Sequence, residues 1–444
     1  MTEEASLLLA LVRQGAEKAT VCTEPAMIAF AAAKSKSLIS ESPARVEVTV
    51  SPGVMKNCLA VGLPGTDRKG PEIAAALGAV VGRPEMGLEA LSGVDPRTVR
   101  EAHRLLDSNS VKASCSLRYT GVYCLARVVG ATRTAEVTIE GNHTRITRMM
   151  VDGQVVVEQP VPPEGMDKGD PAPSRWSSME SVKQFSYGFL LDMIMSADVD
   201  EIQYLQEGAL SALSLAEQSL HGGCSVSLPD FPHALSNILT CAPAKDEVGR
   251  SLITKARLWV AAAVCARMAG VIWPVLTSCG SGNQGISISI PVLLAARAVN
   301  AGPIKEVKSL LLAHATNLYV KAFTGNISAL CGAVSAGAGV AASVCWLMGG
   351  HKKQVEGAAQ TVIGNLYGML CDGAKASCAL KCAAGAAEGA LAGQMAVSGV
   401  FSHGEAGIVG CSLGETLCTI GSFSPVLNQV DPLIVGVRGA RIEG

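Results

Sequence analysis

Three cysteines in the second half of the chain are spaced so that their thiolates could meet at one metal centre. Cys371 and Cys378 lie seven residues apart in CDGAKASC, and Cys331 precedes Cys371 by forty residues. Three soft thiolate ligands suit zinc or iron–sulfur chemistry. A cubane cluster held by only three cysteines leaves one iron open to act as a Lewis acid. Because the chain holds 15 cysteines, the spacing alone is equally compatible with ordinary buried thiols.

A fourth cysteine, Cys22, lies in the segment VCTEP, just before the apolar run AMIAFAAAK. Proline is favoured in the first turn of a helix, so we expect a helix to begin near Pro25. Cys22 then stands just outside a helix N-terminus, where unsatisfied amides stabilise a thiolate, the form that acts as nucleophile or base. The charge of Glu24 acts in the opposite direction, and a half-buried structural cysteine in a turn is the alternative.

A glycine-rich segment, TSCGSGNQG at residues 277–285, matches the GxGxxG pattern of dinucleotide-binding loops. We reject a dinucleotide fold because ISISIP follows with strand-like alternation and Pro291 comes six residues after the last glycine. The segment does offer flexible backbone and the side chains of Ser281, Asn283 and Gln284, which suit a carboxylate. A turn with a purely structural role is the alternative.

The elements that must position these residues indicate an α+β protein with a mainly helical, Ala/Gly-rich catalytic domain and a separate inserted α+β domain. Residues 43–159 form that inserted domain, in which 111–159 alternate as four or five antiparallel strands. Residues 160–175 hold five prolines and are predicted to be a linker. Helical patterns fill 176–444, the predicted catalytic domain, and the helices of 1–42 are expected to pack on it.

Composition excludes several classes of partner. Hydrophobic residues make up 49% of the chain, charged residues 17%, and the formal net charge is −2, which predicts no nucleic-acid or anionic-membrane binding. Residues 324–350 carry no charge, but their Gly, Ala and Ser content favours buried helices over a membrane span. The acidic start differs from a secretory signal, so we expect a cytoplasmic protein. The apolar composition favours a homodimer, and the expected ligand is small.

Together these segments resemble the L-cysteine desulfidase family, which is related to the iron–sulfur L-serine dehydratase alpha chains. The matching stretches follow the family's order over nearly the whole chain: CTEPAMIAFAAAK, SPGVMKN, LPGT, PEIAAALGA, EGNHTRI, ARMAG, SGNQGI, SALCGA and CDGAKASCALK. The sharpest are SGNQGI, SALC, and CDGA with its second cysteine seven residues later.

The resemblance implies an oxygen-sensitive 4Fe-4S cluster on Cys331, Cys371 and Cys378, with no pyridoxal phosphate. It also implies α,β-elimination of a small L-amino acid, with Cys22 as the catalytic base. For L-cysteine the products are hydrogen sulfide, pyruvate and ammonia. The alternatives are an L-serine dehydratase that uses the same mechanism and a non-enzymatic zinc or redox-sensing protein.

The candidate substrate-binding residues are Ser281, Asn283, Gln284, Arg267, Lys56, Asn57 and His143. A guanidinium such as that of Arg267 can hold a carboxylate in a bidentate pair, although a buried helix ion pair is the alternative. Lys56 and Asn57 are candidates from their position in the family alone. A lone histidine on an apolar helix face, such as His314, is more often hydrogen-bonded core.

The remaining thiols and one lysine complete the expectations around the cluster. Cys279, Cys382, Cys411 and Cys418 are predicted to be buried thiols, with Cys382 the one rival ligand. Lys375 lies between two predicted ligands, where its charge would stabilise an anionic cluster unless it is simply solvated.

Two positions depart from the family pattern. Val21 stands where the family usually has glycine, and GEAGI at 404–408 replaces a Gly-Asn-Glu-Gly-Ile type segment. Valine is stiffer than glycine, so the first change bears on how the Cys22 thiol is presented. Neither departure touches the three predicted cluster cysteines.

Overall fold

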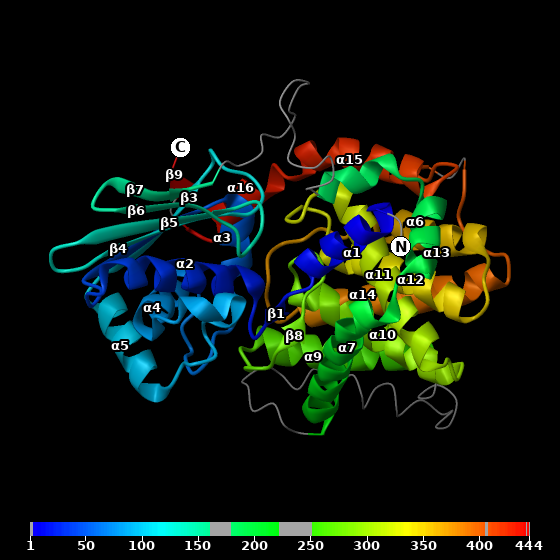
Figure 1. The fold of residues 1–444 in the computed structure, drawn as a ribbon, viewed down its shortest axis with the longest axis horizontal. Helices are drawn as coiled ribbons and strands as arrows, with labels where there is room; N and C mark the ends of the chain where they lie inside the picture. The colour runs from blue at the N-terminus through cyan, green and yellow to red at the C-terminus, as the bar shows by residue number, and fades with distance from the viewer. Residues whose placement is uncertain (1–2, 160–178, 222–250, 405–406, 441, 444) are drawn as a thin grey trace.

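The computed structural model describes residues 3–159, 179–221, 251–404, 407–440 and 442–443. Two layers of structure pack side by side, a helix-covered sheet and a larger body of helices (Figure 1). The α+β fold class is therefore confirmed, with helices as the dominant element. The predicted linker at 160–175, and residues 405 and 406 of the GEAGI segment, lie outside the described residues.

A seven-stranded sheet forms the first layer, in the strand order β7-β6-β5-β4-β2-β3-β9. Its strands are β2 (Arg45–Val50), β3 (Val111–Ser116), β4 (Tyr123–Val129), β5 (Thr134–Glu140), β6 (Ile146–Val151), β7 (Gln154–Glu158) and β9 (Ile442–Glu443). Strands β4 to β7 pair antiparallel, as expected. The prediction was wrong for β3, which runs parallel to β2 because a helical crossover, rather than a hairpin, connects the two.

Two helices cover one face of this sheet, α2 (Thr23–Ile39) and α4 (Pro71–Val81), and α5 (Pro96–Asp107) packs on α4 (Figure 1). Helix α2 is buried on almost every side and packs closely on α4, where a Cβ on Gly78 would lie 2.2 Å from the carbonyl oxygen of Ala29. Helix α1 (Glu3–Gly15) packs on the helical body, whereas α2 packs on the sheet. An alanine-rich helix with no polar face needs burial all round, and the sheet and α4 provide it.

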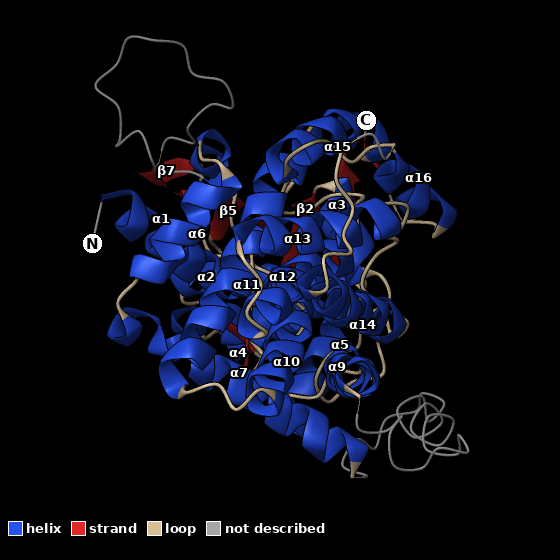
Figure 2. Cartoon of the chain, turned by 90° about the vertical axis from the view of Figure 1, so that its right-hand side faces the viewer, coloured by secondary structure: helices blue, strands red, loops and turns tan. Residues whose placement is uncertain are grey.

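The second layer is built from helices. They are η2 (Met179–Gln184), α6 (Tyr187–Ser196), α7 (Val199–Leu220), α9 (Leu252–Met268), α10 (Gly282–Ala298), α11 (Pro303–Thr324), α12 (Gly332–Leu347), α13 (Lys352–Leu366), α14 (Cys378–Val397) and α15 (Leu413–Leu427). Helix α12 lies at the centre and is buried against α10, α11, α13 and α14 (Figure 2). Glycines allow these close crossings, since a Cβ on Gly385 would lie 2.2 Å from the carbonyl oxygen of Ala333.

The segment ISISIP is helical, so the strand-like reading of its alternation was wrong. It belongs to α10, which runs through Pro291 and is buried on nearly all sides. Small serines and apolar isoleucines both fit a fully buried helix, and for this reason their alternation does not report a strand. The strand before the loop, β8 (Val275–Leu276), pairs antiparallel with β1 (Lys18–Ala19). The described residues around the glycine loop thus contain no parallel βαβ unit.

The end of the chain returns to the sheet. Helix α16 (Val430–Val437) packs against α3 (Pro52–Cys58), and β9 adds a parallel edge strand to β3. The predicted catalytic domain, 176–444, therefore contributes its last elements to the sheet layer. Within the described part of the chain, none of the helices has the length and apolar character that crossing a membrane requires.

Candidate active site

A cavity of about 90 Å³ lies between the two layers and is lined from both sides. The sheet layer contributes Cys22, Glu24, Asn57 and His143, and the helical layer contributes Arg267, Cys279, Ser281, Asn283, Gln284, Lys321, Cys331, Cys371, Cys378, Lys381 and Cys382, among others. The structure thus brings together every predicted site residue except Lys56. The cavity lies between the sheet layer and the helical layer, and ligand sites are commonly found at such an interface.

Cys22 stands at the N-cap of α2 and is 4% exposed. Its thiol donates a hydrogen bond to Oε2 of Glu24 at 3.4 Å, and Nδ2 of Asn57 donates to the other carboxylate oxygen at 2.8 Å. Burial raises the pKa of Cys22 well above its ordinary value of 9.0, and the charge of Glu24 adds to this rise. The nearby guanidinium of Arg267 lowers the same pKa but does not offset burial. Burial and Glu24 thus favour the neutral thiol of Cys22.

Arg267, on α9, is buried and connects the Cys22 turn to the glycine loop. Its Nη2 donates to the carbonyl oxygen of Val21, and its Nη1 donates to Oδ1 of Asn283 at 3.1 Å. The guanidinium fits closely over Gly282, where a Cβ would lie 2.4 Å from Nη2. Arg267 therefore positions other site residues. Among the described residues it forms no ion pair with a carboxylate.

The glycine loop is shaped for close packing. Ser281 caps α10, with its Oγ accepting a hydrogen bond from the backbone amide of Gln284 at 3.4 Å. A Cβ on Gly285 would lie 1.9 Å from the carbonyl oxygen of Leu276, and one on Gly332 would lie 2.5 Å from Nε2 of Gln284. These glycines allow the loop and the start of α12 to approach each other. The GxGxxG pattern of this loop therefore reflects close packing around the cavity rather than phosphate binding.

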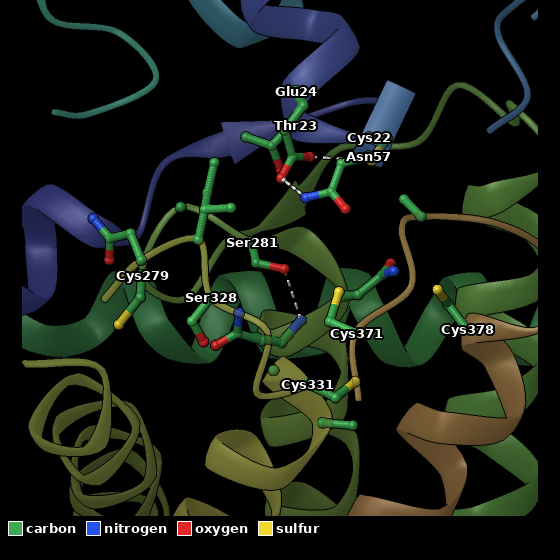
Figure 3. Close-up of a pocket in the computed structure, with 18 of the residues that line it drawn as sticks. Cys22, Thr23, Glu24, Asn57, Cys279, Ser281, Ser328, Cys331, Cys371 and Cys378 are labelled. Atoms are coloured by element: carbon green, nitrogen blue, oxygen red, sulfur yellow. Dashed lines mark hydrogen bonds between the residues drawn. The ribbon is translucent and has the colours of Figure 1, made fainter. Parts of the chain in front are cut away.

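The three predicted cluster cysteines come from two segments that pair with each other. Cys331 caps α12, Cys378 begins α14, and Cys371 lies in the connection before α14. The amide of Cys331 donates to the carbonyl oxygen of Met369 at 3.0 Å, and the amide of Cys371 donates to that of Ala329 at 2.7 Å. This pairing brings cysteines forty residues apart in sequence to one wall of the cavity. Figure 3 shows them grouped below Cys22 and Glu24 in that view.

Three cysteine thiols on one cavity are the donor type that an iron–sulfur cluster uses. Within the described residues, no three His, Cys, Asp or Glu side chains converge closely enough to hold one ion. A cluster is several atoms across, so its thiolates stand around a shared space, as Cys331, Cys371 and Cys378 do here. Burial, with the charge of Cys371, raises the pKa of Cys331 to about 12. Cationic Lys381 lowers the pKa of Cys331 and would stabilise bound thiolates.

The other cysteines divide into two groups. Cys382 and Cys279 are buried, as predicted, and both line the cavity, so Cys382 stays the rival ligand. Cys411 and Cys418 are exposed, and the prediction that they are buried was wrong. Both lie at or near α15, much of which faces solvent.

Lys56 lies outside the cavity and does not fit the predicted substrate-binding role. Its side chain is fully buried and donates to Oδ1 of Asp431 at 2.6 Å and to the carbonyl oxygen of Cys371 at 3.2 Å. Lys56 thus supports the Cys371 loop from behind. Lys375, between two predicted ligands, pairs with Asp372 at 2.6 Å, and Lys381 pairs with the same carboxylate.

His143 enters the cavity from the turn between β5 and β6 and is 4% exposed. Its Nε2 has no hydrogen-bond partner among the described residues, and burial lowers its pKa. A neutral, unpartnered imidazole nitrogen in a polar cavity is available to a ligand. His314, in contrast, shares a 3.0 Å hydrogen bond with Oγ of Ser278 in the core, as predicted.

Sequence reasoning missed three charged residues of the cavity: Glu24 as a ligand-facing acid, and Lys321 and Lys381 as cations. The available signal was a lysine within an apolar stretch, as in LYVKAF. A charge on a buried helix face needs a partner or a role.

Comparison with known proteins agrees with this site. The profile of the serine dehydratase alpha chain family matches residues 86–427, which include the glycine loop and all three predicted cluster cysteines. A UPF0597 protein of Moorella thermoacetica is 37% identical over 92% of both chains. Another, from Porphyromonas gingivalis, is 31% identical over 98% of both chains, so its likeness extends to the Cys22 segment. The chain therefore belongs to the serine dehydratase alpha chain family.

Proposed function

We propose that the protein catalyses the iron–sulfur-dependent α,β-elimination of L-cysteine to hydrogen sulfide, pyruvate and ammonia. The observation that carries this proposal is the cavity, in which Cys22 faces the same space as Cys331, Cys371 and Cys378. Elimination next to a carboxylate requires a base for the Cα proton and a Lewis acid for the leaving group. Cys22 could supply the first, and a metal centre on the three cysteines could supply the second. Membership of the serine dehydratase alpha chain family supports a lyase reaction.

The cavity's charges suit an α-amino acid. Glu24 supplies a carboxylate for the substrate's ammonium group, and it is held in place by Asn57. Ser281, Asn283 and Gln284 also line the cavity, and His143 lies against Gly280 of the same loop. The small volume of the cavity, about 90 Å³, supports a small amino acid as the substrate.

Substrate binding would also activate Cys22. An ammonium group beside Glu24 offsets the negative charge that contributes to the raised pKa of Cys22, while Arg267 already favours the thiolate. Cys22 loses its thiol proton to solvent, and the resulting thiolate then takes the Cα proton. Loss of the β-substituent gives 2-aminoacrylate, which hydrolyses to pyruvate and ammonia.

A cluster on Cys331, Cys371 and Cys378 would, when bound, supply a Lewis acid for the leaving group in place of pyridoxal phosphate. The chain's own part is to hold those thiolates in position. Lys56 fixes the carbonyl of Cys371, and the backbone pairing fixes Cys331 against the same loop.

The second candidate is L-serine dehydration by the same residues, which the family's name favours. Hydroxide is a poorer leaving group than sulfide and needs stronger Lewis-acid assistance. The other alternative, a non-enzymatic zinc or redox-sensing protein, predicts a colourless protein that forms no pyruvate.

The test compares pyruvate formed from L-cysteine and from L-serine by the protein reconstituted with iron and sulfide without oxygen. We expect L-cysteine to give pyruvate and sulfide in equal amounts, and C22A to lose at least about a hundredfold in rate while keeping its iron. Pyruvate from L-serine alone would establish the second candidate. Iron-loaded protein that makes pyruvate from neither amino acid would refute the elimination chemistry.

A further inference from the structure

Lys321 is a buried cation in the cavity wall without a carboxylate partner. It lies on α11, is 2% exposed and lines the same cavity as Cys22 and the cluster cysteines. Its ammonium group donates to the carbonyl oxygen of Asn326 at 3.3 Å. None of the ion pairs among the described residues includes it.

Burying an ammonium group without a counterion is costly, and the chain avoids this cost elsewhere. Lys56 is equally buried but lies 2.6 Å from the carboxylate of Asp431. For Lys321, a single carbonyl oxygen replaces the solvation of a full charge, and burial lowers its pKa. An anion that enters the cavity would therefore gain a strong partner there.

The other cations of the cavity have more hydrogen-bond partners than Lys321, although Nε of Arg267 has none among the described residues. Arg267 uses its Nη groups on the carbonyl of Val21 and the side chain of Asn283. Lys381 pairs with Asp372. Lys321 lines the cavity together with Cys279, Cys331 and Cys371, so an anion bound to it would share the cavity with the predicted cluster cysteines.

We propose that Lys321, rather than Arg267, binds the α-carboxylate of the amino-acid substrate, with Glu24 facing the α-ammonium group. This inference rests on the proposed function and names the residue that recognises the substrate's acid group. A role for Lys321 in balancing the thiolates alone is the competing explanation, and the test separates the two.

The test measures binding of two unreactive probes to the reconstituted full-length protein by calorimetry. L-Alanine has the ammonium and carboxylate groups but no leaving group, and L-alaninamide lacks the carboxylate. We expect wild-type protein to prefer L-alanine. K321M should weaken L-alanine binding by about 10- to 100-fold and change L-alaninamide binding by less than about twofold. K305M, on the same helix but outside the cavity, is the matched control and should bind both probes normally.

Three results would overturn the inference. If wild-type protein binds L-alanine and L-alaninamide equally, no residue of the site recognises the carboxylate. This result does not depend on any variant. K321M that keeps its iron and its L-alanine affinity shows that Lys321 does not bind the carboxylate. If K321M folds but loses its iron, the charge of Lys321 serves to balance the cysteine thiolates rather than to bind the substrate. Neither probe is turned over, so the binding test is independent of the reaction. If the protein prefers L-alanine over L-alaninamide but forms no pyruvate, only the proposed elimination is refuted. If it forms pyruvate but shows no such preference, only the proposed role of Lys321 is refuted.

Discussion

The thiol of Cys22 donates a hydrogen bond to the carboxylate of Glu24 over 3.4 Å, within the cavity that the three cluster cysteines share. Burial and this neighbouring charge keep Cys22 protonated in the free protein, since both raise its pKa. A catalytic base must accept a proton, so the proposed reaction depends on the population of the Cys22 thiolate. The Cys22–Glu24 pair therefore makes the pH dependence of the reaction a sensitive test.

Activity should rise with pH through the alkaline range, and E24Q should move this rise to lower pH. Burial stays in the variant, but the negative charge and the hydrogen bond that also raise the pKa of Cys22 are gone. The measurement is kcat/KM for L-cysteine against pH. E72Q removes a partly buried carboxylate outside the cavity and should leave the profile in place. A shift of the E24Q profile to higher pH would contradict the account.

K56M should destabilise the protein by about 3–5 kcal/mol, because it leaves the buried carboxylate of Asp431 without its partner. The variant should also retain less iron, since Lys56 holds the carbonyl of Cys371. Urea unfolding and iron content measure the two effects. As a control, K183M removes an exposed ion pair with Glu180 and should cost less than about 1 kcal/mol. Equal stability of K56M and wild type would show that the buried pair is not needed.

Gly285→Ala should disrupt the site, whereas Gly188→Ala should not. A Cβ at Gly285 would lie 1.9 Å from a backbone carbonyl oxygen, so the loop must shift, at a cost of about 3 kcal/mol or more. Gly188 lies in α6 with open space around it, and alanine there should be neutral or stabilising by up to about 1 kcal/mol. Thermal unfolding of both variants checks this. A normal unfolding temperature for Gly285→Ala would be inconsistent with the observed packing.

Stability should fall as pH rises above about 9. Burial raises the pKa of Cys279 to about 12 and that of Cys58 well above 9.0, so these thiols stay protonated in the folded protein but ionise at about 9.0 when it unfolds. The unfolded state then binds fewer protons, and each group costs up to about 1.4 kcal/mol of stability per pH unit. Unfolding temperatures between pH 8 and 10.5 measure this. C58A should flatten the dependence and C418A, at an exposed position, should not; a flat wild-type curve would contradict it.

Local signals in the sequence predicted much of the framework. Pro25 marked the start of α2 and placed Cys22 at its cap, and alternation located the strands of 111–159. Hydrophobic periodicity gave wrong predictions for helices that are buried on all sides. Helix α10 and helix α2 have no polar face, so periodicity could not show that the first is a helix or that the second packs on the sheet.

The site was predictable in its cysteines and less so in its charges. The spacing of Cys331, Cys371 and Cys378, together with the family resemblance, predicted that these cysteines lie close together, and all three line one cavity. The pairing of Lys56 with Asp431, 375 residues away, and the isolation of Lys321 depend on tertiary contacts that a single sequence does not contain. Lys56, predicted to bind substrate, is therefore structural, whereas Lys321, which sequence reasoning missed, lines the cavity.

The most direct test of the central claim is the visible absorption spectrum, with iron and sulfide content, of protein reconstituted without oxygen, read together with pyruvate formed from L-cysteine. The account predicts a brown protein that turns over L-cysteine. C371A should lose both colour and activity, while C382A, one helical turn beyond Cys378, should keep both. A colourless protein, or a C371A variant that keeps its cluster and its activity, would contradict it.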